Sequence, residues 1–232
     1  MLLELNIKTT KDLEKYLEIL KHEDYSVVST TSKKGNMDLG LVLNCLNRDN
    51  LTITPTFSCS SNYNKNADLT YNNFLNFIQI LKQHNIHQLL LVSGNPKMKL
   101  DTIKVLQQFN DSRIKIAVAY NPYSKNLEIE NQRLIAKLQF MIVNQVWLQL
   151  GQDVQKLQAS VQFIKNINPN IIIVNSILAP TTNLLKSLQF RPWSGVYYSD
   201  QFYNDINFAL QSVQEMKDLS QELNLEILIN GR

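Results

Sequence analysis

The sequence predicts an α/β fold, a single-domain (β/α)8 TIM barrel over residues 1–232. Residues 89–92 are four consecutive apolar residues without alternation, which is typical of a parallel strand covered on both faces. Short apolar or β-branched runs alternate with amphipathic helices roughly eight times along the chain, as βα repeats do. The length of 232 residues is close to the about 250 of such a barrel, and no linker-like change of composition divides the chain.

The first half of the chain predicts four strands, each followed by a helix. The strands are expected at 1–7, 25–29, 51–56 and 89–92, and the helices at 13–20, 39–46, 71–81 and 100–106. Leu13, Tyr16, Leu17 and Leu20 illustrate the helical pattern, because their spacing places them on one face. The strand at 51–56 is rich in β-branched residues, with Pro55 near its end.

The second half predicts four more strands. They are expected at 114–119, 145–150, 171–174 and 225–229, with helices at 127–143, 154–164, 183–188 and 202–222 and an irregular region at 190–200. Gly151 ends the sixth strand, and a β-branched run makes the seventh. Aromatic residues gather at 193–203, where they are expected either to pack in the core or to form an interface.

The composition excludes several classes of function. The net charge of +3 comes from scattered residues without a basic run, so no nucleic-acid partner is expected. Six glycines include no Gly-rich phosphate loop, and the two cysteines form no CxxC pair. No apolar run approaches about 18 residues, and Glu4 comes too early for a signal peptide. We therefore expect a soluble, cytoplasmic protein without membrane association.

The carboxyl ends of the predicted strands form the rim where barrels bind their ligands. The residues expected there are Glu4–Asn6, Ser29–Thr30, Thr56, Ser93–Asn95, Tyr120–Pro122, Gln149 and Asn175–Ser176. This rim has no histidine, which argues against a Ser-His-Asp hydrolase or a metal centre. If Glu4 is partly desolvated, its raised pKa would let it act as a general acid; equally, it is the solvent-facing or ion-paired residue of a frayed strand.

The order and spacing of several motifs resemble the methylenetetrahydrofolate reductase family over nearly the whole chain. Residues 89–96 (L-L-L-V-S-G-N-P) are similar to the family's L-A-L-R-G-D-x-P, and 118–122 (V-A-Y-N-P) to its V-A-A-Y-P. Residues 147–150 (W-L-Q-L) resemble its I-T-Q-F, and 54–59 (T-P-T-F-S-C) its P-H-L-T-C. Residues 3–5, 26–30 and 176–180 resemble its first strand, its S-V-T-Y and its G-I-L-P.

The resemblance implies a barrel that binds FAD and passes a hydride from NAD(P)H to methylenetetrahydrofolate, giving methyltetrahydrofolate in one-carbon metabolism. It implies that Glu4 is the proton donor, that Ser29 positions it, and that Gln149 holds the folate ring. The residues that it implies for the flavin or nicotinamide are Thr56, Ser93, Gly94, Asn95, Tyr120 and Lys137. No metal is implied.

The sequence departs from the family mainly on the flavin side. The family's R-G-D is Ser93-Gly94-Asn95 here, Thr56 replaces a histidine, and Leu138 replaces a lysine beside Lys137. Three hypotheses follow: a reductase of methylenetetrahydrofolate with or without FAD, a non-redox folate-binding or methyl-transfer module, and a catalytically degenerate barrel. The degenerate barrel would be the interaction subunit of an active relative. Both a homo-oligomer and a hetero-oligomer with such a relative are therefore open as assemblies.

Overall fold

A computed structural model describes residues 2–5, 7, 9–22, 27–32, 38–46, 52–60, 67–93, 100–193 and 195–230. Strands and helices alternate along these residues, and each strand pairing with a defined register is parallel. The parallel α/β architecture predicted from the sequence is therefore confirmed. The chain divides into two compact units, Met1–Val118 with Phe140–Asn144 (unit 1) and Ala119–Gln139 with Gln145–Arg232 (unit 2). Closure of the sheet into one barrel domain stays a prediction.

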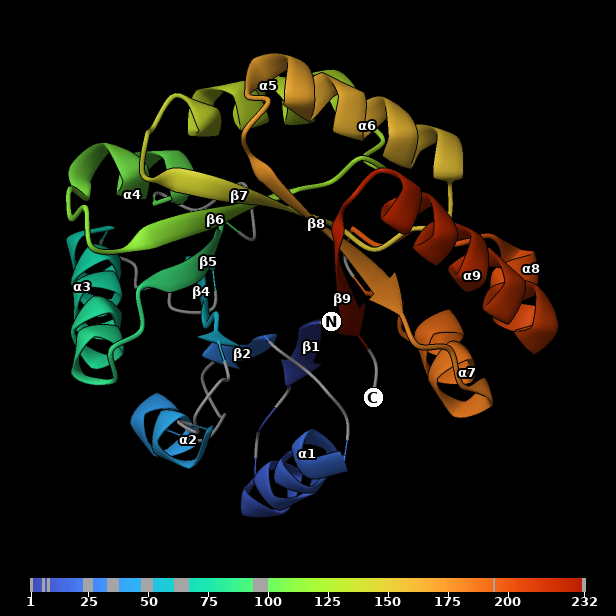
Figure 1. Ribbon diagram of the computed structural model, residues 1–232, viewed down its shortest axis with the longest axis horizontal. Coiled ribbons are helices and arrows are strands. Elements are labelled where there is room, and N and C mark those ends of the chain that lie inside the picture. The colour runs from blue at the N-terminus through green and yellow to red at the C-terminus, as the bar shows by residue number, and fades with distance from the viewer. Residues whose placement is uncertain are drawn as a thin grey trace. The chain divides into compact units, whose positions relative to one another are not determined.

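Unit 1 holds the N-terminal βα repeats (Figure 1). Its elements are β1 (Leu2–Leu5), α1 (Thr10–His22), β2 (Val27–Ser32), α2 (Leu39–Leu46), β3 (Thr52–Ile53), β4 (Thr56–Ser58), α3 (Ala67–Gln83), β5 (Gln88–Val92), α4 (Thr102–Gln108) and the start of β6 (Lys115–Tyr120). β1 pairs with β2, β2 with β3 and β4, β4 with β5, and β5 with β6. This order is that of successive βα repeats.

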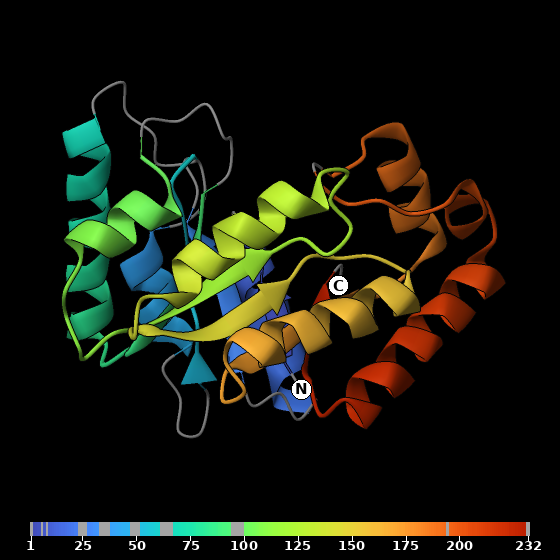
Figure 2. The same ribbon diagram turned by 90° about the horizontal axis from the view of Figure 1, so that it is seen from above.

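Phenylalanine rings hold α3 against the sheet of unit 1. The ring of Phe57 on β4 meets Phe74 and Phe77 on α3 edge to face, with ring centroids 5.3 Å apart in each pair. Phe74 also meets Phe109 at the end of α4, at 5.1 Å, and α3 and α4 lie side by side in both views (Figures 1 and 2). Phe57 therefore faces the helices, and its neighbours Thr56 and Ser58 face the other side of the sheet.

Unit 2 holds the C-terminal repeats. Its elements are α5 (Leu127–Leu138), most of β7 (Val143–Leu148), α6 (Val154–Ile167), β8 (Ile172–Leu178), α7 (Thr182–Phe190), α8 (Asp200–Asn204), α9 (Ile206–Glu222) and β9 (Glu226–Asn230). β8 pairs with β7 on one side and β9 on the other. The Asn175 side chain donates from Nδ2 to Ser220 Oγ at 2.9 Å, so this residue of β8 faces α9 (Figure 1).

Three predictions in the first half and middle of the chain differ from the structure in their boundaries. The strand expected at 51–56 is two short strands, β3 and β4, because Pro55 between them has no N–H for the sheet. The helix expected at 127–143 ends at Leu138, and β7 begins at Val143, two residues before the strand expected at 145–150. The second predicted strand, 25–29, is β2 at Val27–Ser32, while Tyr25 and Ser26 lie outside the described residues.

Two further boundaries differ near the C-terminus. The helix expected at 202–222 is divided into α8 and α9 by Asp205, whose φ of −126° and ψ of 106° are extended. Its carboxylate accepts from the backbone N–H groups of Asn207 and Phe208 and so caps α9. β8 runs on to Leu178, so Asn175 and Ser176 lie within the strand and not after it. No helix in the described part of the chain is both long and apolar enough to cross a membrane.

Candidate functional site

Strand register sorts the residues of β8 and β9 between two faces. Asn175 faces α9. Because side chains alternate along a strand, Ser176 and Leu178 lie on the opposite face of the sheet. We call this face the inner face of unit 2. Leu178 pairs with Asn230, the last residue of β9, which places Asn230 on the inner face as well.

The end of β7 adds a glutamine to the same face. Leu148 pairs with Asn175 and therefore faces the helices, so Trp147 and Gln149 face inward. Trp147 Nε1 donates to Gln145 Oε1 at 3.0 Å, and both side chains are buried below the rim. Gln149 is half-buried, and its backbone N–H donates to Tyr120 O at 2.9 Å.

The loop before α8 meets this face at Gly195. Asn121, just after β6, donates from Nδ2 to the carbonyl of Gly195 at 2.9 Å, and its Oδ1 accepts from Tyr123 N at 3.0 Å. Gly195 has a φ of +80°, and a Cβ there would lie 3.4 Å from both Asn121 Nδ2 and Gln149 Nε2. Asn121, Gln149 and the loop therefore meet at one place.

We name Asn121, Gln149, Ser176 and Asn230 the rim cluster. All four stand at or near the carboxyl ends of strands β6 to β9, and none carries a charge. Asn121 uses its amide to hold Gly195 and Tyr123. The amides of Gln149 and Asn230 both donate and accept, so the cluster suits an uncharged heterocycle with alternating donors and acceptors. Asn230 is 4% exposed, and its Nδ2 has no hydrogen-bond partner among the described residues.

In unit 1, Glu4 and Thr56 lie on one face of the sheet. Glu4 pairs with Ser29 of β2, and Thr31, two residues further on, pairs with Thr56 of β4. Because side chains alternate along a strand, Glu4 shares the face of Thr56, opposite to Phe57 and α3. Glu4 is half-buried and Thr56 is buried. Glu4 and Ser29 are partners in the parallel register of β1 and β2, and their roles stay predictions.

The residues implied for a cofactor make contacts within the protein. Lys137 is 7% exposed and donates from Nζ to Ala119 O at 2.7 Å. Tyr120 is buried against α5 and α6: its hydroxyl donates to Asn131 Oδ1 at 2.6 Å and its ring stacks on Phe163. Burial raises the Tyr120 pKa.

Ser93 is the last described residue before the stretch that resembles the family's R-G-D. Its hydroxyl donates to Thr102 Oγ1 at 2.8 Å and accepts from Thr102 N at 3.1 Å, so it holds the start of α4. Gly94 and Asn95 lie outside the described residues. Since a diphosphate needs free cations or helix N–H groups, the contacts of Ser93 and Lys137 do not fit FAD. FAD binding stays a prediction without support from these residues.

Cys59 follows β4 and is the last residue of the stretch that resembles the family's P-H-L-T-C. Its side chain is fully buried, and burial, with the charge of Asp101 adding to it, raises the thiol pKa to about 12. A thiol with so high a pKa stays protonated near neutral pH and is no nucleophile. No three His, Cys, Asp or Glu side chains in the described part of the chain are arranged to hold a metal ion.

The sequence places Asn121 on the predicted rim, within Tyr120–Pro122, but assigns it no role, and Asn230 is not among the predicted rim residues. Asn121 stands in V-A-Y-N-P, and an asparagine after a strand and before proline is a turn signal. Asn230 follows the apolar strand E-I-L-I near the end of the sequence, in a place like that of Gln149 after β7. The alternation of strand faces would have placed it on the rim.

The aromatic region at 193–203 is part core and part surface. Tyr198 stacks on the buried Phe202, with centroids 4.0 Å and planes 12° apart. Trp193 and Tyr197 are 42% and 43% exposed, and Lys125 lies over the Tyr197 ring at 5.8 Å. Tyr198 and Phe202 therefore pack in the core, which is one of the two roles expected for this region. An interface role stays open for Trp193 and Tyr197.

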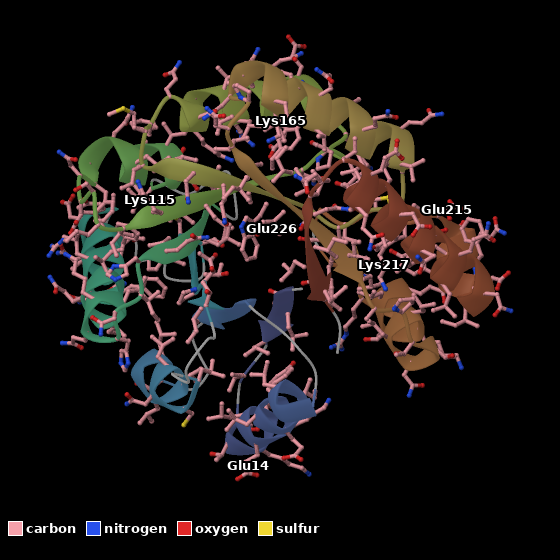
Figure 3. The ribbon with its side chains drawn as sticks, viewed as in Figure 1. Glu14, Lys115, Lys165, Glu215, Lys217 and Glu226 are labelled. Carbon is pink, nitrogen blue, oxygen red and sulfur yellow. The ribbon has the colours of Figure 1, made fainter. Side chains whose placement is uncertain are left out.

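A cavity of about 320 Å³ lies at the opposite, amino ends of β8 and β9. Lys165 of α6 and Glu226 of β9, both labelled in Figure 3, contribute to its lining. Lys165 Nζ donates to the carbonyls of Pro169 and Ile171, at 3.0 and 2.8 Å, so its ammonium holds the turn before β8. These contacts are structural, and the rim cluster is the better candidate site.

Comparisons with known proteins show the fold. No family model matches the chain, and no curated protein matches it in sequence. An uncharacterized protein from Clostridium thermocellum that binds two copies of 5-methyl-5,6,7,8-tetrahydrofolic acid has a similar structure, with a TM-score of 0.68 and 12% identity over 100% of this chain and 88% of that one. At this identity the likeness concerns the fold alone.

Two other solved structures are similar at lower scores. One is 2,3-dimethylmalate lyase, with a TM-score of 0.53 and 8% identity over 99% of this chain and 73% of that one. The other is a monomeric dihydrodipicolinate synthase variant, with a TM-score of 0.51 and 10% identity over 96% of this chain and 79% of that one. The fold is therefore TIM-barrel-like α/β. Membership of the methylenetetrahydrofolate reductase family stays a proposal.

Proposed function

We propose that the chain binds a reduced folate, with the pterin ring against the rim cluster. The observation that carries this proposal is the position of Gln149: half-buried, on the inner face at the end of β7, and beside Asn121. The resemblance to methylenetetrahydrofolate reductases implies a folate-holding glutamine at this residue. The structurally similar Clostridium thermocellum protein, which binds 5-methyltetrahydrofolate, adds support.

The chemistry of the cluster matches a pterin. A pterin ring presents neighbouring N–H donors and N or O acceptors along one edge and carries no net charge. A glutamine amide pairs with such an edge through its own donor and acceptor. Because an ionised side chain would be poorly compensated by an uncharged ring, a cluster of amides and one hydroxyl is the better partner.

Replacing Gln149 tests folate binding directly. Gln149→Leu keeps the approximate volume and removes the amide, so we expect the affinity for 5-methyltetrahydrofolate to fall by about tenfold or more. Gln155→Leu, an exposed position on α6, is the matched control and should bind as the unaltered chain does. Equal affinities for the Gln149 and Gln155 variants would refute the proposed site.

Reduction of methylenetetrahydrofolate by NAD(P)H is the second candidate function, and the partial burial of Glu4 favours it. Glu4 is half-buried on the face of Thr56. As a general acid it would donate its proton to the folate, so that the ring containing the bridging carbon opens to an iminium. The nicotinamide supplies the hydride that the iminium accepts. The protein's part is then to orient the ring and hold this proton.

Glu4→Gln separates reduction from binding. In a reductase it lowers turnover sharply, because the proton donor is lost, and leaves the affinity for folate nearly unchanged. The assay follows oxidation of NADH or NADPH with methylenetetrahydrofolate, with and without added FAD, together with the visible spectrum of the protein. Folate binding without NAD(P)H oxidation by the unaltered chain would leave a non-redox folate-binding module.

A further inference from the structure

Asn230 has a buried side-chain donor that finds no hydrogen-bond partner in the described part of the chain. The residue is 4% exposed at the end of β9, and its backbone carbonyl accepts from Ala179 N at 2.7 Å. Its Nδ2 makes no hydrogen bond with any described residue. Because an unpaired buried N–H costs free energy, native proteins rarely keep one unless a ligand or another group completes it.

The two described strand residues that lie next to Asn230 on the inner face of β8 and β9 are apolar. Leu178 is its partner across the β8–β9 register, and Leu228 precedes it by two residues on the same face. Both are apolar and buried. The side-chain N–H groups of Asn230 therefore stand at the rim with hydrocarbon beside them, on the same face as Ser176 and Gln149.

We propose that Asn230 is a ligand-binding residue whose Nδ2 donates to the ring carbonyl of an oxo-pterin. The inference rests on the proposed folate site, and it narrows the ligand class to folates that keep the 4-oxo group. An antifolate with an amino group at that position presents N–H donors to the N–H donors of Asn230. The amino group of the analogue and Nδ2 of Asn230 cannot hydrogen-bond to each other, and both are removed from water. Such analogues therefore bind weakly.

The test combines a variant with a pair of ligands. Asn230→Leu removes the donor at similar volume, and we expect its affinity for 5-methyltetrahydrofolate to fall about tenfold. Its ligand-free thermal midpoint should equal or exceed that of the unaltered chain, because an uncompensated buried donor is gone. Asn207→Leu, at an exposed position on α9, is the control.

The unaltered chain gives an independent reading that needs no variant. We expect it to bind 5-methyltetrahydrofolate at least about tenfold more tightly than the 4-amino tetrahydrofolate analogue. Asn230→Asp, which replaces the donor with an acceptor, should shift this preference toward the 4-amino compound.

The outcomes separate this inference from the folate site itself. If the unaltered chain binds no 5-methyltetrahydrofolate, the proposed function fails and the role of Asn230 fails with it. If the unaltered chain binds it, but binds the 4-amino analogue equally well or Asn230→Leu keeps full affinity, only the role of Asn230 is overturned. A lowered ligand-free midpoint in Asn230→Leu would show that Nδ2 has a structural partner, which also overturns it.

Discussion

The side chain of Asn121 donates a 2.9 Å hydrogen bond to the carbonyl of Gly195, joining the end of β6 to the loop that precedes α8. Gly195 is in the left-handed region, with a φ of +80°. Gln152 holds the same loop further on, where its Oε1 accepts from Ser199 N at 3.0 Å. The orientation of Asn121 in the rim cluster therefore depends on a backbone conformation that favours glycine.

Gly195→Ala should lower both stability and folate affinity. An L side chain at this φ costs on the order of 1–2 kcal/mol, so we expect the free energy of unfolding to fall by about that amount. Gly195→Asn is the matched variant, because asparagine tolerates the left-handed region better than alanine. Denaturant unfolding of both variants is the measurement. If asparagine destabilises as much as alanine, contact with the neighbouring amides and not backbone strain is the cause.

The two cysteines should differ strongly in reactivity. Cys45 is exposed, whereas Cys59 is buried and its pKa is raised to about 12. At pH 8 we expect one fast reaction with a thiol reagent, and a second only when the chain is unfolded. Cys45→Ser is the control that should abolish the fast phase. Rapid labelling of Cys59 in the folded protein would contradict its burial after β4.

Asp111 should stabilise unit 1 only above acidic pH. Its carboxylate pairs with Arg113 and with Lys82 of α3, the latter at 2.6 Å, and these hydrogen bonds hold its pKa well below the ordinary value. A depressed pKa in the folded state contributes stability above the unfolded pKa of about 3.9 and loses it as the pH falls further.

Comparison with Asp111→Asn measures this contribution. We expect the free energy of unfolding of the unaltered chain to exceed that of the variant by up to about 1 kcal/mol at pH 7, because the ion pairs of Asp111 lie near the surface. Below pH 4 this difference should become progressively smaller. Added salt should also reduce the difference. A difference that stays constant from pH 7 to pH 2 would assign the effect to packing.

Ser220→Ala should destabilise the layer between β8 and α9. Asn175 is fully buried, its Nδ2 donates to Ser220 Oγ, and its Oδ1 has no hydrogen-bond partner among the described residues. Loss of the hydroxyl would leave the whole amide unsatisfied, so the free energy of unfolding should fall by about 1–3 kcal/mol. When Asn175 is already replaced by leucine, Ser220→Ala should lower the free energy of unfolding by less than it does in the unaltered chain. A double-mutant cycle measures this coupling. Additive losses would mean that the two side chains do not interact.

The elements of the fold were largely predictable because their signals are local. The apolar run of β5 and the amphipathic stripe of α3 are both present where the pattern indicates them. Element boundaries were harder to predict from the sequence where a single residue decides them. Asp205 divides one predicted helix into α8 and α9 because its carboxylate caps α9. The helix predicted for 127–143 ends early, at Leu138, because the apolar run of residues 140–143 suits a helix and a buried strand alike.

The site was predictable in part. Gln149 and Glu4 were named from a resemblance, and register places each on the face away from the helices. The engagement of Lys137 with Ala119 O could not be foreseen, because a lysine in a helix reveals neither its depth nor its partner. The alternation of strand faces predicts a place on the rim for Asn230, but its burial without a hydrogen-bond partner among the described residues is visible only in three dimensions.

The most direct test of the account is a calorimetric titration of the unaltered chain with 5-methyltetrahydrofolate, repeated with Gln149→Leu. We expect saturable binding with a Kd below about 1 mM for the unaltered chain and an affinity at least about tenfold lower for the variant. Absence of saturable binding by the unaltered chain would contradict the folate site. Binding that Gln149→Leu leaves unchanged would place the ligand away from the rim cluster.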